Sequence, residues 1–449
     1  MRERRRHPQL RREVSRTMAK TKVNGYWFYR WLDERGVETV EEFERLVIEP
    51  EVADDLRRLA KDAAERQIDS SDEVTAGSEN SILAGMDMDL SGLHSCPSVG
   101  CRIIQVEELF RRAWFYFDRI IVADFLSSHL ADPPESRGEN PIALVDDVRI
   151  LLHLREIGAE DIVSFCPKTA RLARSEAGEL LVAAGLPDFV RQNDQLVEEV
   201  ADQISFKGFE EMPDGVVAAS FSHPFIPWKW GVVLPKEHDE DPSRFASQWL
   251  VDICLSRFVI DLSVARCIKA PLGSTDPLYH RFMLSSPAAL RAPDIAFNLN
   301  LPVLHKIPIE TLLKIRLDES GHFERFRDSL RRALGEQLKL QPERRTIELA
   351  NEITRDVIEP ELRQIRRRLK AADSALQRKT GISLGVGALL TTCGLLTGFA
   401  PAAVLGIGTM AGGLVVPAQQ YVDKRADVEL SDMFFLWKAM QHVSESSQH

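Results

Sequence analysis

The stretch CRIIQVEELFRRAWFYFDRIIVAD, residues 101–124, decides the fold class. Its pattern predicts a short strand, a helix and a second strand in close succession. The closing segment RIIVAD is β-branched and bounded by polar residues, as is typical of a buried strand. Because strands and helices mix here while helical patterns prevail elsewhere, we predict an α-rich α+β fold. Its mixed N-terminal and central body precedes a helical C-terminal third that ends in a hydrophobic helical hairpin.

Helices are expected on both sides of this stretch. Residues 26–66 predict helices. The first of them ends at Gly36, and the helical stretch that follows is interrupted near Pro50. Further helices are expected over 141–157, over about 188–205, and from the Asp241–Pro242 start signal onward. Two segments that read GVVAASFS and WGVVLP predict strands, joined by HPFIPWK, whose prolines argue against a regular element there. DIVSFC predicts one more strand.

The C-terminal third is predicted to be almost wholly helical from residue 308. Phe323, Phe326, Leu330 and Leu334 step by three and four positions, which places them on one face of a helix. A long helix is expected over about 343–380, with a kink at Pro360. The predicted domains are a basic arm (1–25), an α+β body (26–300, with a linker at 67–95), a helical region (301–380), a hairpin (381–422) and a C-terminal helix and tail (423–449).

Charge and cysteine usage limit the classes of function. The net charge of −11 argues against a protein that coats nucleic acid. Residues 1–22 nevertheless carry nine Lys or Arg against two Glu, so this arm is either a disordered tail or a contact for nucleic acid or anionic lipid. Met18 is an alternative start. Six scattered cysteines suggest no disulfide framework, which favours a reducing cytosol.

One long stretch contains no charged residue. It covers the 43 positions between Lys379 and Asp423, in a chain that is 28% charged. Gly381–Phe399 would span roughly 28 Å and Ala402–Val422 roughly 31 Å as helices, and the hydrocarbon core of a bilayer is about 30 Å thick. Pro401 lies where a turn is needed. The segment therefore predicts a helical hairpin that crosses a membrane and returns.

Small residues and basic flanks support this interpretation. Three small-xxx-small glycine pairs permit the close backbone approach that drives helix packing in lipid, and positive charge on both flanks predicts that both chain termini face the cytoplasm. The packing residues expected are Gly381, Gly385, Gly394, Gly398, Pro401, Gly408 and Gly412, and the basic residues expected to face lipid headgroups are Arg366, Arg367, Arg368, Lys370, Lys424 and Arg425.

Other interpretations of the hairpin stay open. It can be buried within a soluble domain or an oligomer, or sheltered until a trigger inserts it. Its alternation of amphipathic helix, uncharged hairpin and amphipathic helix resembles the hydrophobic hairpin of pore-forming colicin domains, without shared motif residues. Phe434, Phe435 and Trp437 near the C-terminus either sit at a membrane interface or pack back onto the body.

Few residues point to chemistry. His94, Cys96 and Cys101 are weak zinc candidates, because no second ligand pair accompanies them. Asp118 and Asp124 flank the strand RIIV, where carboxylates can hold a divalent cation as nucleases require; Asp146 and Asp147 are expected to open a later helix. The segment around His223, Trp228 and Trp230 is either a ligand pocket or packing under a loop. No strong catalytic motif occurs, so we expect no cofactor.

The segments YFDRIIVAD, DDVRILLHLREIGAEDIV, LPVLHKIPIETLLKIR and FFLWKAM, together with the Gly-rich hairpin, resemble a loose set of uncharacterised bacterial proteins. The resemblance implies bacterial origin and no activity. We therefore expect a membrane-associated protein of the bacterial cytoplasm and inner membrane, a sensor or effector in defence or growth arrest whose partner is the lipid membrane. The alternatives are a soluble metal-dependent hydrolase or nuclease-like effector with the hairpin buried, and a scaffold that forms homo-oligomers.

Overall fold

The computed structural model describes residues 26–69, 80–91, 98–131, 141–166, 189–211, 216–224, 226–235, 242–283, 288–299, 301, 307–341, 344–364, 367 and 435–436. The chain is rich in helices with small sheets, which confirms an α-rich α+β class. It divides into two compact units. Unit 1 comprises the residues up to Asn298 together with Leu338–Ile347, and unit 2 comprises Leu299–Gln337 and the residues from Glu348 onward.

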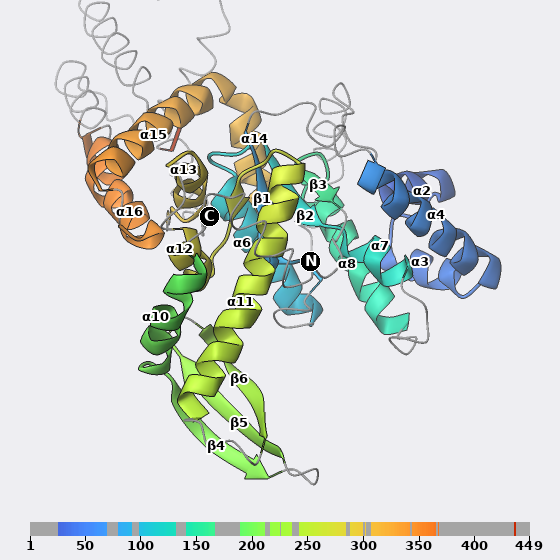
Figure 1. Ribbon diagram of the computed structural model, residues 1–449. Coiled ribbons are helices and arrows are strands. Elements are labelled where there is room, and N and C mark those ends of the chain that lie inside the picture. The colour runs from blue at the N-terminus through green and yellow to red at the C-terminus, as the bar shows by residue number, and fades with distance from the viewer. Residues whose placement is uncertain are drawn as a thin grey trace, which may run out of the picture. The chain divides into compact units, whose positions relative to one another are not determined.

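A parallel sheet of four short strands organises unit 1 (Figure 1). The strands are β1 (Ser81–Ala84), β2 (Arg119–Ala123), β3 (Val163–Cys166) and β7 (Leu272–Gly273), and their order is β3-β2-β1-β7. Successive strands β1, β2 and β3 advance to one side, whereas β7 pairs with the other side of β1. The direction of the connections therefore reverses between β1 and β7, and such a reversal is where parallel sheets bind ligands, beyond the carboxyl ends of their strands.

Helices connect and cover these strands. Helix α6 (Val99–Ala113) joins β1 to β2, and α7 (Phe125–Ala131) with α8 (Pro141–Glu156) joins β2 to β3. Strand side chains such as Ile82, Ile120 and Ile121 are almost completely buried. Burial of consecutive residues is expected when helices cover both faces of a parallel sheet.

A second sheet is inserted between β3 and β7. It is antiparallel, in the order β4 (Ser205–Glu211), β5 (Val216–His223), β6 (Ile226–Pro235). Helices α10 (Phe189–Ala201) and α11 (Pro242–Cys267) accompany it (Figure 1). One apolar core connects the two sheets of unit 1 through helix α11. Phe221 of β5, Phe258 of α11 and Leu83 of β1 belong to the same cluster of buried residues.

Three helices precede the parallel sheet: α2 (Trp27–Arg35), α3 (Val40–Val47) and α4 (Pro50–Asp69). Gly36 ends α2 in the left-handed conformation, with φ of 63°, and α4 begins at Pro50, so both predicted boundaries are confirmed. The ring of Tyr26 stacks on that of Phe165 in β3, with 4.1 Å between centroids. The hydroxyl of Tyr29 donates to the Leu151 carbonyl of α8 at 2.9 Å. These two contacts hold helix α2 and the residue before it against β3 and α8.

Unit 1 also contains helices α12 (Pro277–Met283) and α13 (Ala288–Phe297). In unit 2 the described elements are α14 (Ile309–Asp318), most of α15 (Ser320–Leu340), all but the start of α16 (Thr346–Ile353) and a π-helical segment (Thr354–Ile358). The predicted stripe on α15 is confirmed, because Phe323, Phe326, Leu330 and Leu334 are at most 2% exposed. Phe435 packs its ring against Phe323 and Phe326 with centroids 5.1 and 6.0 Å apart. The C-terminal aromatic residues are expected either to sit at a membrane interface or to pack onto the rest of the chain, and Phe435 does the latter.

The predicted kink at Pro360 appears as a change of helix type. The π-helical segment ends two residues before this proline. Because proline has no N–H and its ring clashes with the carbonyl four residues back, the preceding turn widens to accommodate it.

Several predicted elements are wrong. Residues 101–106 belong to helix α6 and form no strand, since Arg102, Val106 and Leu109 recur at helical spacing on its buried face. Asp146 and Asp147 lie inside α8 and do not open it. HPFIPWK is partly regular, because β6 begins at Ile226 and includes Pro227. Strand β6 is at the edge of its sheet, where a residue without an N–H is tolerated.

The predicted hairpin over 381–422 lies outside the described residues, as do its glycines, Pro401, Lys424 and Arg425. Among the residues expected to face headgroups, Arg367 is described, and it is exposed. No helix within the described ranges combines the length and apolar character needed to cross a membrane.

Candidate functional site

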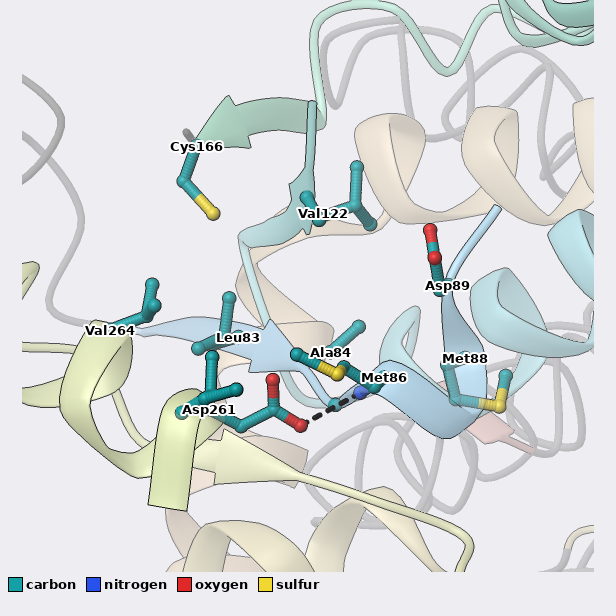
Figure 2. A pocket seen from close by; sticks show the side chains of 12 residues that line it. Leu83, Ala84, Met86, Met88, Asp89, Val122, Cys166, Asp261 and Val264 are labelled. Carbon is teal, nitrogen blue, oxygen red and sulfur yellow. Dashed lines mark hydrogen bonds between the residues drawn. The ribbon is translucent and has the colours of Figure 1, made fainter. Parts of the chain in front are cut away.

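Carboxylates gather at the carboxyl edge of the parallel sheet. Asp87 lies in the 3-10 turn Met86–Met88 that follows β1, and Asp89 follows it directly. Asp276 lies three residues after β7, and Asp261 projects from α11 toward the end of β1 (Figure 2). Four acidic side chains from three segments of the chain are thus placed around the point where the strand connections reverse.

A small pocket opens at this edge (Figure 2). The ends of β1, β2 and β3 contribute Ala84, Ala123 and Cys166, the turn after β1 contributes Met88 and Asp89, and α11 contributes Asp261; the remaining lining residues are Leu83, Gly85, Met86, Val122, Ile260 and Val264. Its wall is mostly apolar with a few convergent polar groups, as in small-molecule sites.

Hydrogen bonds of Asp87 join the turn after β1 to the loop after β7. Its Oδ1 accepts the Ser274 hydroxyl at 2.9 Å. Its Oδ2 accepts both the backbone N–H and the hydroxyl of Thr275, each at 2.6 Å. The backbone N–H of Gly85 also donates to the Gly273 carbonyl at 2.8 Å. These bonds hold the turn after β1 against the loop after β7.

Asp261 is buried with one oxygen engaged. Its Oδ2 accepts the backbone N–H of Met86 at 2.8 Å and the hydroxyl of Tyr279 at 2.9 Å. Burial raises the pKa of this carboxyl to about 8, and the charges of Asp87 and Asp89 add to the rise. Figure 2 shows the other oxygen turned away from the Met86 bond. A carboxyl group with a raised pKa therefore lines the pocket.

Asp276 is perturbed in the same direction. Burial raises its pKa to about 6, and the Asp87 charge contributes to this rise. Two arginines place positive charge near these carboxylates. The charge of Arg257 on α11 lowers the pKa of Asp276. Burial lowers the pKa of Arg112 on α6, and the charge of Asp87 acts against this shift. Groups whose pKa values are shifted by burial and by one another concentrate at functional sites.

Two glycines of this edge have close neighbours where a side chain would be. A Cβ on Gly85 would lie 2.8 Å from Asp87 Oδ1 and 3.3 Å from the Gly273 carbonyl. A Cβ on Gly273 would lie 2.4 Å from Ile82 Cδ1. The loops therefore approach closely because neither residue has a side chain.

The two aspartates singled out from sequence do not come together. Asp118 precedes β2 and Asp124 follows it, so about six residue steps of roughly 3.3 Å place them at opposite edges of the sheet. The amide of Asn80 donates to Asp118 at 3.0 Å. Asp124 accepts the Tyr26 hydroxyl at 2.8 Å and both the N–H and hydroxyl of Ser127 at 2.9 and 2.6 Å. Asp124 thus caps α7 and holds α2 through Tyr26, and the two carboxylates lie too far apart to bind one cation together.

The other candidates have structural roles or fall outside the described ranges. Asp147 forms a buried ion pair with Arg102 at 2.6 Å and contacts His129 at 3.0 Å. The Nε2 atom of His223 lies 3.2 Å from the Val200 carbonyl oxygen, and burial lowers the pKa of this histidine. Of the two interpretations of its segment, packing therefore holds for His223. Cys101 is exposed on α6, and His94 and Cys96 are not among the described residues. The backbone of Trp228 and Trp230 belongs to β6.

Sequence reasoning missed Asp87, Asp261 and Asp276. The signal for two of them was the same one that picked out Asp124: an acidic residue just after a short apolar run, in SILAGMD and in APLGSTD. Both runs were too short to be recognised as strands. Asp261 had no local signal, because it lies on a long helix among apolar neighbours.

Within the described parts of the chain, no three His, Cys, Asp or Glu side chains are arranged as a set of metal ligands. No protein-family model matches the chain, and neither a curated protein nor a solved structure is significantly similar to it.

Proposed function

We propose that unit 1 is a divalent-cation-dependent hydrolase of phosphate esters whose reaction centre lies at the carboxyl edge of the parallel sheet, near Asp87, Asp261 and Asp276. The observation that carries this proposal is their convergence on the carboxyl edge of the parallel sheet, where burial and mutual repulsion raise the pKa values of Asp261 and Asp276. A divalent cation would offset that repulsion. Mg²⁺ keeps several of its waters and is usually held by one or two carboxylates together with substrate phosphates.

Because the described carboxylates form no three-ligand set, a cation would be held by one or two of them together with the substrate phosphate. Asp261 has one oxygen free of its two hydrogen bonds and lines the pocket. Asp87 and Asp276 are partly buried, and the negative charge of Asp87 adds to the effect of burial in raising the pKa of Asp276. A bound cation would supply a polarised phosphoryl group and an activated water. Arg112 and Arg257 place positive charge beside the same edge, which favours an anionic substrate.

The test is hydrolysis by the full-length chain. Single-stranded RNA, single-stranded DNA and bis-p-nitrophenyl phosphate would be incubated with Mg²⁺ or Mn²⁺ and with EDTA. We expect cation-dependent cleavage of at least one substrate, lost in Asp276→Asn and retained in Asp118→Asn, because Asp118 lies at the opposite edge. Cleavage that survives EDTA, or that is lost equally in both variants, would contradict the assignment.

A second candidate function is membrane association through residues 381–422. Its support is the run of 43 uncharged positions between Lys379 and Asp423 with basic residues on both flanks. On this proposal the chain is a bacterial effector in defence or growth arrest, which acts at the inner membrane with both termini in the cytoplasm. Close glycine packing would hold the two halves together.

Fractionation tests the membrane proposal. The full-length chain and a version that lacks residues 381–422 would be expressed, and the membranes washed with carbonate. We expect only the full-length chain in the washed membranes, and expect Gly398→Leu with Gly408→Leu to abolish any effect on membrane permeability. Recovery of both versions in the cytosol would favour a buried hairpin or an assembly surface.

A further inference from the structure

One oxygen of Asp261 is open to the pocket. The side chain is only 6% exposed, and the two donors that reach it both bind Oδ2: the Met86 N–H at 2.8 Å and the Tyr279 hydroxyl at 2.9 Å. Figure 2 shows Oδ1 turned away from the Met86 bond, and Asp261 is part of the pocket wall. Among the residues that the structure describes, none donates to Oδ1 and none forms an ion pair with Asp261.

These hydrogen bonds decide where the acid proton of Asp261 sits. Because Oδ2 already accepts two donors, the proton of the neutral carboxyl lies on Oδ1 and can be donated into the pocket. A buried carboxylate without a cationic partner is costly, which favours the neutral form. Burial raises the pKa of Asp261 to about 8, and the charges of Asp87 and Asp89 add to the rise. In its neutral form Asp261 therefore offers the pocket a hydrogen-bond donor.

The rest of the pocket suits an uncharged molecule. Leu83 of β1 and Val264 of α11 contribute hydrocarbon to its wall. The thiol of Cys166 is uncharged as well, because burial raises its pKa to about 12. Asp89 is a second acidic group of the wall, and it accepts the backbone N–H and the hydroxyl of Ser91 at 3.0 and 2.5 Å. None of the described lining residues is Lys, Arg or His, so an anion would find no partner there.

We propose that this pocket binds a compact uncharged molecule, apolar apart from one carbonyl oxygen or ring nitrogen that accepts a hydrogen bond from Asp261. Small-molecule sites combine apolar walls with a few polar groups that fix the orientation of the ligand. A protonated aspartic acid in an apolar site can donate a hydrogen bond in this way. The inference concerns binding alone and does not depend on the proposed hydrolysis.

Methionine methyl signals report on the pocket, because Met86 and Met88 both belong to its wall. The full-length chain, with its nine methionines labelled at the ¹³C methyl, would be titrated with cyclopentanone in EDTA at pH 7. Met86→Leu and Met88→Leu would assign the two signals. We expect both signals to shift and saturate, while the signal of Met283, which is buried on α12 outside the pocket wall, stays in place.

Two charged molecules with the same ring are the matched controls. Cyclopentanecarboxylate is an anion at pH 7 and cyclopentylamine is a cation. Neither accepts a hydrogen bond from Asp261 without placing a charge in an apolar pocket, so we expect each to bind at least about tenfold more weakly than cyclopentanone.

Substitution of Asp261 tests the direction of the hydrogen bond. In Asp261→Asn the amide oxygen can still accept from Met86 and Tyr279 while the amide NH₂ donates into the pocket. We therefore expect cyclopentanone to bind this variant with nearly wild-type affinity. Asp261→Leu has no donor and should bind at least about tenfold more weakly.

The affinity should also depend on pH. Wild-type affinity should fall about tenfold between pH 7 and pH 9, because Asp261 loses its proton with a pKa of about 8, whereas Asp261→Asn should bind equally at both. The acidic groups whose charges act on Asp261 are Asp87 and Asp89. Burial raises the pKa of Tyr279 well above its usual range and that of Cys166 to about 12, so neither titrates here.

Three results would overturn the proposal. The first is the absence of a saturable shift at Met86 and Met88 with cyclopentanone. The second is tighter binding of cyclopentylamine, which would show that Asp261 acts as a carboxylate. The third is loss of binding in folded Asp261→Asn; if that variant does not fold, the three probes on the wild-type chain still decide. Hydrolysis is assayed with other substrates and with a cation present, so failure here leaves the proposed hydrolysis standing.

Discussion

The carboxylate of Asp87 accepts two hydrogen bonds from Thr275, one from its backbone N–H and one from its hydroxyl, both at 2.6 Å. The two residues are 188 positions apart in sequence. They lie after β1 and β7, the adjacent strands between which the chain connections reverse. This contact closes the edge of the sheet at which the candidate site is built.

Removal of the Asp87 carboxylate should destabilise unit 1. Asp87→Ala leaves the Ser274 hydroxyl and both Thr275 donors without their acceptor, and an unsatisfied buried donor costs about 1–3 kcal/mol. We expect a loss of roughly 3 kcal/mol in the free energy of unfolding, measured with urea. Asp54→Ala is the control, because its ion pair with Arg57 is exposed. Equal stability of the two variants would contradict the structural role of Asp87.

Stability should fall as pH rises through the range in which Asp261 titrates. The pKa of Asp261 is raised to about 8 by burial and by its acidic neighbours, whereas an aspartate in an unfolded chain titrates near 3.9. Between these values the folded protein holds a proton that the unfolded chain has released. The free energy of unfolding therefore decreases by at most about 1.4 kcal/mol per pH unit from this group.

Urea unfolding at pH 5, 6, 7 and 8 in EDTA measures this slope. Asp261→Asn should flatten it, because the amide does not titrate and still offers an oxygen to Met86 N–H and to the Tyr279 hydroxyl. Part of the slope between about pH 4 and 6 should remain, since the pKa of Asp276 is raised to about 6. A slope of the same size in the variant would show that Asp261 is ionised in the folded protein.

Asp124 should matter for stability and not for the site. Tyr26→Phe removes one of the donors to Asp124 and should cost about 1–3 kcal/mol, because a buried carboxylate loses a hydrogen bond. Mn²⁺ affinity should not change, since the hydrogen bonds of Asp124 hold α2 and α7 in place. Asp118→Asn should leave both properties nearly unchanged. Loss of Mn²⁺ binding in Tyr26→Phe without loss of stability would reverse this assignment.

Gly85→Ala should disturb the edge of the sheet. The added Cβ would lie 2.8 Å from Asp87 Oδ1 and 3.3 Å from the Gly273 carbonyl, so the Asp87 carboxylate must shift from its hydrogen-bonded position. We expect lower stability and weaker Mn²⁺ binding. Gly335→Ala is the opposite case: it lies within α15 with no atom within 4 Å of a new Cβ. It should stabilise the chain by up to about 1 kcal/mol, as helix propensity predicts.

Local sequence was sufficient for most of the helices. The left-handed end of α2 at Gly36, the starts of α4 at Pro50 and α11 at Pro242, and the buried stripe of α15 could all be predicted. These features depend on residues within a few positions of one another. Hydrophobic spacing and the backbone restrictions of glycine and proline act at that range.

The strands were harder to predict because several are very short. Strand β7 has two residues and β1 has four, so neither contains a recognisable alternation. They are strands because β1 pairs with both β2 and β7 in a buried parallel sheet. The same limit explains residues 101–106, whose β-branched pair suits a strand while their buried face follows helical spacing.

By itself, the sequence determined the helix-rich class, the ends of several helices and the existence of an uncharged segment at 381–422, because each depends on neighbouring residues. Only the tertiary structure decided the candidate site. Asp87, Asp261 and Asp276 come from distant segments, and the pKa values of Asp261 and Asp276 are raised by burial and by the negative charge of Asp87. The separation of Asp118 from Asp124 was likewise decided by the direction of β2, which carries them to opposite edges of the sheet.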